Sequence, residues 1–380
     1  MIRLRPLLFQ LHWFLGLTAG FVLMVCGVTG ALLTFEEEIV AGLSPGIVTV
    51  APRPESRLTP DALLSRLQAQ APARRVAQLA LSGEPGRAAR IRFAPEGGRG
   101  RGETVYADPY DGRILGSGRG EAVFGVILRL HRWLLVPGEG NGWGRTLTGT
   151  SLFGLIYLAL SGLYLRWPRR LGDWRIWLKP ALNRRGRPLY WSLHSVLGTW
   201  VLVIYLVIAL TGLWWSFGWY RDGATLLLTG RVPQAEAAEP RRPDGPAALD
   251  PAFAAFEAAS GGRYALATLA PPRGAEPIRI RAVMADAPHR QARDDWRIRP
   301  DGTILSSDRY VARPLGERLA GSMLAVHEGR FFGWPGTILF FLAALAMPLF
   351  GVTGLLLYLG RRRSRRRAAL ARGEAMPQRG

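Results

Sequence analysis

Four long apolar stretches dominate the 380-residue sequence and limit the folds that are open to it. They cover residues 13–35, 146–167, 195–219 and 337–359. Each has about the 20 residues that a helix needs to cross the hydrocarbon core of a bilayer. The sequence therefore predicts a multi-pass membrane protein and excludes a single soluble globule.

The basic residues indicate how these stretches are oriented, within a net charge of +21. They precede the first stretch (Arg3, Arg5), fill the link between the second and third (Arg166, Arg169, Arg170, Arg175, Lys179, Arg184, Arg185, Arg187) and follow the fourth (361–367). By the positive-inside rule, both termini and the short link are cytoplasmic, and the long connections 37–145 and 220–336 are exported. We expect a membrane protein whose basic loop and tail face the surface of membrane lipid, with no nucleic-acid partner.

The first stretch begins like a secretory signal but is too long for one. Three glutamates at 36–38 stand where a small-residue cleavage site would be, so we expect a retained anchor. The single cysteine, Cys26, lies inside this stretch, which excludes a disulfide framework and a cysteine-ligated metal site. We interpret Cys26 as a packed side chain.

An internal duplication runs through the chain. Residues 5–16 read RPLLFQLHWFLG and residues 187–198 read RPLYWSLHSVLG. A hydroxyl–glycine pair recurs in every apolar stretch: Thr29–Gly30, Ser161–Gly162, Thr211–Gly212 and Thr353–Gly354. Such small residues allow close approach either of helices to one another or of a helix to a flat cofactor, and both interpretations stay open.

The exported segments repeat as well. Thr59 and Asp250 are good N-caps, followed by Pro60 and Pro251 at the first helical position. Short strands are predicted at 76–81, 90–94, 103–107, 264–269, 278–283 and 296–299, and turns at 109–112 and 299–302. The stretches 96–102 and 233–249 are typical of flexible loops or linkers.

These patterns predict a membrane all-α four-helix bundle with two exported α+β domains, built by duplication. The boundaries are a first span at 1–36, an exported domain at 37–120, an amphipathic helix and second span at 121–167, a basic loop at 168–187, a third span at 188–219, a second exported domain at 220–314, an amphipathic helix and fourth span at 315–360, and a basic tail at 361–380.

Four of the five histidines occur once per span. His12 and His194 stand near the cytoplasmic ends of spans one and three, each seven residues after an arginine. His131 and His327 precede spans two and four on the exported side, each within an apolar helical pattern. A lone histidine at a membrane boundary is more often a hydrogen-bonded interfacial residue, but two matched pairs are what two bis-histidine haem b sites require.

Other metals fit this set of residues less well. Zinc and copper usually recruit further ligands, and neither a cysteine nor an acidic residue is near His12 or His194 in the sequence. We therefore predict two haems b, with iron held by His12 and His194 and by His131 and His327. His289 has no counterpart in the repeat, and we expect it at the surface.

The chain resembles the PepSY-associated transmembrane family, which includes iron-regulated membrane proteins and ferric-siderophore reductases. The resemblance rests on the LH-x-x-LG signatures at His12 and His194, the LH at His131, and the segment 105–116, VYADPYDGRILG. The second unit departs from it, because Ile298 and Arg299 stand where Asp108 and Pro109 do. The resemblance implies four spans, two periplasmic PepSY-like domains and, for the reductases, two b haems on the four histidines.

The function expected from this resemblance is haem-dependent reduction of a periplasmic ferric-siderophore or other ferric chelate. Exported arginines (Arg90, Arg92, Arg279, Arg281) could attract an anionic chelate, although solvated strand faces explain them equally well. Trp200, Trp214 and Trp215 could lie between the haems or simply pack. A dinucleotide-binding G-x-G-x-x-G is absent from the sequence, so quinol or a separate flavoprotein must donate electrons. The alternatives are a non-redox adaptor that binds a partner such as a protease and, third, a metal transporter.

Overall fold

The computed structural model describes residues 4–95, 102–168, 172–231, 248–271 and 276–374. The expected linkers at 96–102 and 233–249 lie almost entirely outside these residues, as do Arg3, Arg169 and Arg170. The chain divides into two compact units. We call Met1–Thr34, Val126–Ala224 and Val326–Gly380 the helical unit, and Phe35–Gly125 and Thr225–Ala325 the sheet unit.

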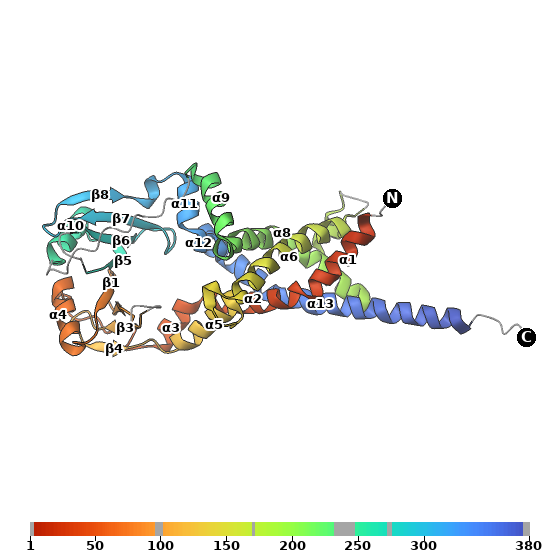
Figure 1. Cartoon of the computed structure of the whole chain (residues 1–380), viewed down its shortest axis with the longest axis horizontal. Helices are drawn as coiled ribbons and strands as arrows, with labels where there is room; N and C mark the ends of the chain where they lie inside the picture. The colour runs from red at the N-terminus through yellow and green to blue at the C-terminus, as the bar shows by residue number, and fades with distance from the viewer. Residues whose placement is uncertain (1–3, 96–101, 169–171, 232–247, 272–275, 375–380) are drawn as a thin grey trace, which may run out of the picture. The chain divides into compact units, whose positions relative to one another are not determined.

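The helical unit contains the apolar stretches. Its helices, some of which begin or end at the unit boundaries, are α1 (Leu4–Leu17), α2 (Ala19–Thr34), α5 (Glu121–Trp133), α6 (Trp143–Arg166), α7 (Trp174–Leu178), α8 (Arg187–Ser216), α9 (Gly218–Thr229), α12 (Met323–His327) and α13 (Gly333–Glu374) (Figure 1). Within the described residues, α6, α8 and the segment Arg330–Ala371 are long and apolar enough to cross a membrane. Together, α1 and α2 form a fourth candidate span.

The uninterrupted apolar sequence of the first stretch suggested one straight helix, but the structure has two helices there. α1 and α2 meet at an angle of 51°. Thr18 lies between them, and its hydroxyl donates a hydrogen bond to the carbonyl of Phe14 at 2.9 Å. Gly16 and Gly20 lie on either side of Thr18 in the sequence. Helices are known to bend at glycines and at threonines whose hydroxyl bonds the carbonyl four residues earlier.

The long helices pack through small side chains. α13 lies against α2 and α8, while α6 lies against α1, α2 and α8. A Cβ atom added to Gly27 of α2 would lie 2.5 Å from the Cβ of Met347, so glycine is needed where α2 and α13 touch. A buried apolar cluster fills the centre of this unit, formed by Leu23, Leu155, Tyr205, Ala209, Ala343 and Met347.

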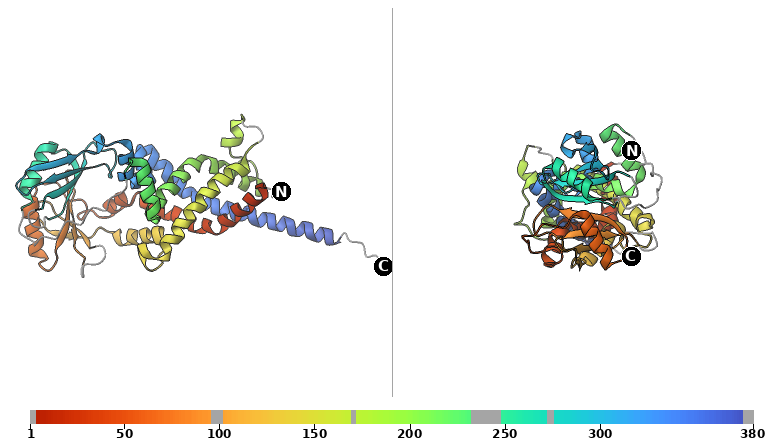
Figure 2. Two further views of the ribbon diagram at one scale, coloured as in Figure 1. Left: turned by 45° about the horizontal axis from the view of Figure 1, so that its top comes forward. Right: turned by 90° about the vertical axis from the view of Figure 1, so that its left-hand side faces the viewer.

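The sheet unit is built on one antiparallel sheet of eight strands. The strands are β1 (Val76–Ser82), β2 (Ala89–Phe93), β3 (Thr104–Ala107), β4 (Ile114–Gly116), β5 (Tyr264–Leu269), β6 (Ile278–Met284), β7 (Arg293–Ile298) and β8 (Ile304–Asp308). Their order is β4-β3-β2-β1-β5-β6-β7-β8, so each half of the duplication supplies four consecutive strands (Figure 2). The sequence pattern predicted six of them; β4 and β8 follow the two turns and are short or fully exposed, so no apolar alternation marks them.

The two long connections were expected to form separate exported domains, but their described residues belong largely to one compact unit. β1 and β5 pair through Leu79 with Leu269 and Leu81 with Ala267. In separate domains both strands would be open edges with unpaired backbone groups, and pairing them removes that liability. The shared core contains Leu79, Ile91, Phe256, Ile280 and Ile298.

Four helices complete the sheet unit: α3 (Glu36–Leu43), α4 (Pro60–Gln70), α10 (Asp250–Ser260) and α11 (Leu315–Gly321). α4 and α10 contribute Leu63, Leu67, Phe253 and Phe256 to the core on one face of the sheet. α11 and α12 correspond to a single predicted amphipathic helix, which breaks at the buried Ser322.

The N-termini of α4 and α10 cap each other. Thr59 accepts from the backbone N–H of Ala62 in its own helix, as predicted. Asp250 instead accepts from the N–H of Asp61 at 2.8 Å, while Asp61 accepts from the N–H groups of Leu249 and Asp250. The prediction that Asp250 caps its own helix is therefore wrong, because the duplication places a second helix N-terminus within reach.

Replacing Asp61 by alanine should loosen the junction between α4 and α10. It would leave the N–H groups of Leu249 and Asp250 without this acceptor, at a cost of about 1–3 kcal/mol. Hydrogen exchange of the full chain should show faster exchange at these two amides. Asp286→Ala removes the same charge from an exposed turn and should leave their exchange unchanged. Equal effects of the two variants would contradict the cross-capping.

Candidate functional site

The structure brings the four span-associated histidines together in two pairs. The ring centroids of His12 and His194 are 6.3 Å apart, and those of His131 and His327 are 6.4 Å apart. Both pairs have the same angle of 71° between ring planes. They are the pairs expected from the charge-based topology, and their equal geometry reflects the duplication.

Each histidine is held by the hydroxyl of one hydroxyl–glycine pair. Nδ1 of His12 lies 2.8 Å from Ser161 Oγ, that of His131 lies 3.0 Å from Thr29 Oγ1, that of His194 lies 2.9 Å from Thr353 Oγ1, and that of His327 lies 2.8 Å from Thr211 Oγ1. The sequence revealed these hydroxyls as a repeated feature but did not show that histidines are their partners.

The direction of these hydrogen bonds follows from the helix backbone. Each of the four hydroxyls lies 2.6 Å from the carbonyl four residues earlier, to which it donates its only proton; these carbonyls belong to Tyr157, Val25, Leu349 and Val207. Each hydroxyl can then only accept from the histidine, so Nδ1 carries the proton. For His131 the carbonyl of Cys26, 3.0 Å from Nδ1, requires the same tautomer.

This tautomer leaves a lone pair on Nε2 of all four rings. A histidine that ligates a metal through Nε2 commonly donates its Nδ1–H to a fixed acceptor, which sets the tautomer and the ring orientation. With Nδ1 protonated, Nε2 is the ring nitrogen that could bind a metal in each of the four histidines.

The glycine of each pair lies beside Cε1 of the histidine ring, and at Gly30 and Gly162 a Cβ atom would come closer to the ring than ordinary van der Waals contact. A Cβ atom at Gly30 would lie 3.1 Å from Cε1 of His131, and one at Gly162 would lie 3.3 Å from Cε1 of His12. The corresponding distances are 3.5 Å for Gly212 and His327 and 3.6 Å for Gly354 and His194. In each hydroxyl–glycine pair the hydroxyl bonds the histidine ring and the glycine lies beside it. Neither helix packing nor contact with a flat cofactor, the two interpretations drawn from the sequence, included this role.

The duplication also explains how each pair is assembled. In the first repeat, Ser161 and Thr29 hold His12 and His131; in the second, Thr353 and Thr211 hold His194 and His327. Each ring is positioned by its own repeat but faces a ring of the other repeat. Both candidate sites therefore lie where the two repeats meet.

The spacing within each pair fits one metal ion between two imidazoles. A metal–imidazole bond is about 2 Å long and the ring centroid lies about 1 Å beyond the nitrogen, so two rings on opposite sides of one ion have centroids about 6 Å apart. The observed 6.3 and 6.4 Å agree with this distance. Each ring can rotate about its own metal bond, so the angle of 71° is compatible with axial ligation.

The set of donors favours a metal that brings its own equatorial ligands. Within the residues that the structure describes, no group of three or more His, Cys, Asp or Glu side chains is arranged to hold a metal ion. Structural zinc needs four protein ligands and catalytic zinc three, whereas the porphyrin of a haem leaves two axial positions for the protein. Two histidines per site match that requirement.

A large cavity opens beside the first pair. It has a volume of about 1320 Å³ and includes both His12 and His194 in its lining. Sites for small ligands typically have about 300–1,000 Å³, so a macrocycle has enough room here. Glycines from several helices are among its lining residues: Gly16, Gly20, Gly162, Gly198, Gly351 and Gly354.

Aromatic side chains accompany both pairs. Phe350 lies 5.5 Å from the ring of His194 and 5.7 Å from that of Tyr205, whose hydroxyl donates to the carbonyl of Ala343. Trp215 lies 5.4 Å from the ring of His327. Of the three tryptophans considered from the sequence, only Trp215 has a ring contact with a histidine among the contacts described, and Trp200 is half exposed.

His289 is buried, so its expected place at the surface is wrong. Only 8% of it is exposed, and its Nε2 lies 3.1 Å from the hydroxyl of Tyr310, which also accepts from Ser322. Burial, and then the nearby Arg318, hold the pKa of His289 below its usual value, so the ring is neutral at pH 7. The residues next to His289 in the sequence are mostly polar, so the sequence suggested a surface position. Tyr310, which contacts His289, is 21 residues away in the chain.

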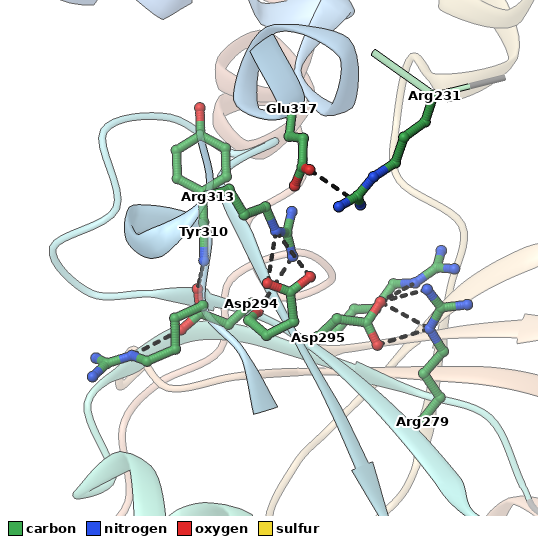
Figure 3. A network of polar contacts seen from close by, with 10 residues as sticks. Arg231, Arg279, Asp294, Asp295, Tyr310, Arg313 and Glu317 are labelled. Atoms are coloured by element: carbon green, nitrogen blue, oxygen red, sulfur yellow. Dashed lines mark hydrogen bonds and ion pairs between the residues drawn. The ribbon is translucent and has the colours of Figure 1, made fainter. Parts of the chain in front are cut away.

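The four arginines that were expected on the exported side lie on the face of the sheet opposite α4 and α10. The register places Arg90, Ala80, Thr268 and Arg281 in one row across β2, β1, β5 and β6. Asp295 contacts the guanidinium groups of both Arg279, at 2.5 Å, and Arg281, at 3.7 Å (Figure 3). Strands from both repeats thus contribute to one basic face.

The comparison with known families agrees with a membrane protein that has several apolar helices. The family described as the PepSY-associated TM region matches residues 9–361, a range that includes the four apolar stretches and the four paired histidines. None of the curated proteins compared with the chain matches it. The duplicated unit of apolar helices and an intervening α+β segment, matched over nearly its whole length, therefore identifies this multi-pass membrane protein as a member of the PepSY-associated transmembrane family.

Proposed function

We propose that this protein binds two haems b and moves electrons across a bacterial inner membrane to a periplasmic ferric chelate, such as a ferric-siderophore. The observation that carries the proposal is the geometry of the two histidine pairs. Four rings with fixed tautomers face each other at the spacing of bis-imidazole ligation, and no third protein donor accompanies them in the described residues.

The protein groups have separate tasks in this function. His12 and His194 would hold one haem iron, and His131 and His327 the other, each through Nε2. The hydroxyls of Ser161, Thr353, Thr29 and Thr211 hold the rings by accepting their Nδ1–H groups. When bound, a bis-histidine haem supplies reversible one-electron chemistry without an open position for oxygen.

The proposed topology treats α1 and α2 as one broken span, which completes a four-helix bundle with α6, α8 and α13. The positive-inside rule then places both termini in the cytoplasm. His12 and His194 lie near the cytoplasmic side in this arrangement, and His131 and His327 near the exported side. The two halves of the sheet unit correspond to the two PepSY-like modules, now joined through β1 and β5.

The basic face of the sheet suits an anionic ferric chelate. Arg90, Arg92, Arg279 and Arg281 come from both repeats, and Asp295 is the acidic residue placed among them by the described ion pairs. One electron converts Fe(III) in the chelate to Fe(II), which oxygen ligands hold less tightly. The electron comes from a donor outside this chain, either quinol or a separate flavoprotein.

Stopped-flow reoxidation tests this function directly. The purified protein, reduced with dithionite, is mixed with a panel of ferric chelates while a ferrous-specific dye reports the product. We expect haem absorbance and faster reoxidation by at least one chelate than by buffer, with about one Fe(II) per electron released. A haem-containing protein that no chelate oxidises faster than buffer would contradict the reductase function, and a colourless protein would contradict haem binding itself.

A non-redox adaptor is the second candidate, and one observation favours it. The edge strand β8 is exposed at all five of its residues, including Ile304 and Leu305. Such an edge can pair with an extended segment of a partner protein. An adaptor would need no haem, so the absorbance of the purified protein separates the two candidates.

A further inference from the structure

The cavity beside His12 and His194 has a strongly basic mouth. Six arginines of its lining come from the first turns of α1 and α8 and from the C-terminal part of α13: Arg5, Arg187, Arg361, Arg362, Arg365 and Arg366. No aspartate or glutamate is among the residues that line it. Like charges gathered around a cavity of low polarity repel one another, so the mouth is suited to an anion.

A seventh arginine of the lining, Arg166, already has its partners. Its guanidinium donates to Thr199 Oγ1 and to the carbonyls of Ser195, Ile176 and Trp177. It therefore ties α6 to α7 and α8 inside the protein. The anion has to be bound by the arginines at the mouth.

Two of those arginines are related by the duplication. Arg5 and Arg187 each precede a paired histidine by seven residues, which is about 10 Å along a helix. Arg5 uses one of its five N–H groups on the carbonyl of Leu165, at 3.1 Å, and can direct others into the cavity. Two repeat-related arginines beside one histidine pair match a ligand with two carboxylates on one edge.

Arg361 adds a third cation from α13. Its guanidinium lies over the ring of Phe9 in α1, 4.2 Å from the ring centre, and both residues line the cavity. Arginine forks bind carboxylates through two parallel hydrogen bonds, so three forks are sufficient for two carboxylates.

We propose that Arg5, Arg187 and Arg361 bind the two propionate carboxylates of the haem held by His12 and His194. This inference rests on the proposed haem at that pair. The cationic groups also act on the iron, because positive charge nearby favours the reduced, less positive state. They raise the reduction potential of this haem relative to the same site without them.

The test replaces single arginines in the full-length protein. In Arg187→Gln and Arg361→Gln we expect a lower midpoint potential for one haem only, the one that His194→Ala removes. We also expect about 10-fold faster transfer of that haem to an excess of apomyoglobin. Arg187→Lys should restore part of the potential because it keeps the charge.

Arg363→Gln is the matched control. Arg363 is in the same helix as Arg361, is exposed and is not part of the cavity lining, so its replacement removes the same charge from outside the site. Equal shifts in Arg363→Gln and Arg361→Gln would overturn the proposal, as would no shift in any variant that retains two haems. A wild-type protein without haem would instead refute the proposed function.

A lipid phosphate offers the arginines the same kind of anionic oxygen. Nanodiscs of zwitterionic lipid alone and nanodiscs with anionic lipid separate the two ligands. For propionates, the wild-type potential and haem transfer rate are the same in both. A dependence on anionic lipid that Arg187→Gln abolishes would assign the arginines to lipid and overturn the proposal.

Discussion

Replacing His194 by alanine should reduce the haem content of the purified protein from two per chain to one. Ligation of each iron needs both rings of a pair, and the ring of His12 alone, 6.3 Å away in the native pair, cannot replace its partner. Haem per protein and the redox-difference spectrum measure this loss. The remaining signal should be the one that His327→Ala removes.

The same measurement on all four histidine variants tests which histidines form a pair. His12→Ala and His194→Ala should remove the same spectral component, and His131→Ala and His327→Ala the other. His289→Gln is the control, since its ring bonds Tyr310 within the sheet unit and belongs to neither pair. An unchanged spectrum in any of the four alanine variants would refute haem ligation by that residue, and different components for His12 and His194 would refute the pairing.

Replacing Thr353 by valine should weaken haem binding at the first pair by about 10- to 100-fold. Valine keeps the shape of threonine but cannot accept the Nδ1–H of His194, which is 2.9 Å away in the native protein. The ring then loses both its fixed tautomer and its orientation. The rate of haem transfer to apomyoglobin measures the change, and the electron paramagnetic resonance signal of that haem should shift with it.

Two further variants separate this effect from a general change in packing. Thr353→Ser retains the hydroxyl and should bind haem nearly as the wild type does. Thr337→Val alters another buried threonine of α13, whose hydroxyl donates to the carbonyl of Gly333 and contacts no histidine in the described bonds. If Thr337→Val weakened haem binding as much as Thr353→Val does, the proposed role of the hydroxyl would be wrong.

Features that depend on neighbouring residues were predictable. Uninterrupted apolar composition marked the helices that could span the membrane, and alternation of apolar residues marked β1 and β5. Thr59 was recognised as an N-cap because its partner is three residues away. Asp250 was misassigned because the groups that it binds belong to α4, about 190 residues earlier.

At the candidate site, too, local sequence features were predictable and contacts between distant residues were not. Repeated sequence around His12 and His194 identified both as functional candidates, and the distribution of charge predicted the same membrane face for both. Their hydroxyl partners are 149 and 159 residues away in the chain, so no local pattern could connect them. One feature of the sequence hinted at this partnership: the number of span-associated histidines equals the number of recurring hydroxyl–glycine pairs, four of each.

By itself the sequence determined the apolar helices, the duplication and the four histidines, because composition and spacing express the local demands of helices, strands and membranes. Only the tertiary structure decided that β1 joins β5 in one sheet, that His289 is buried under Tyr310, and that each paired histidine is seated by a hydroxyl and a glycine. These contacts depend on how helices and strands distant in the chain pack at van der Waals distance. Packing of that kind is a property of the whole fold, and no single segment contains it.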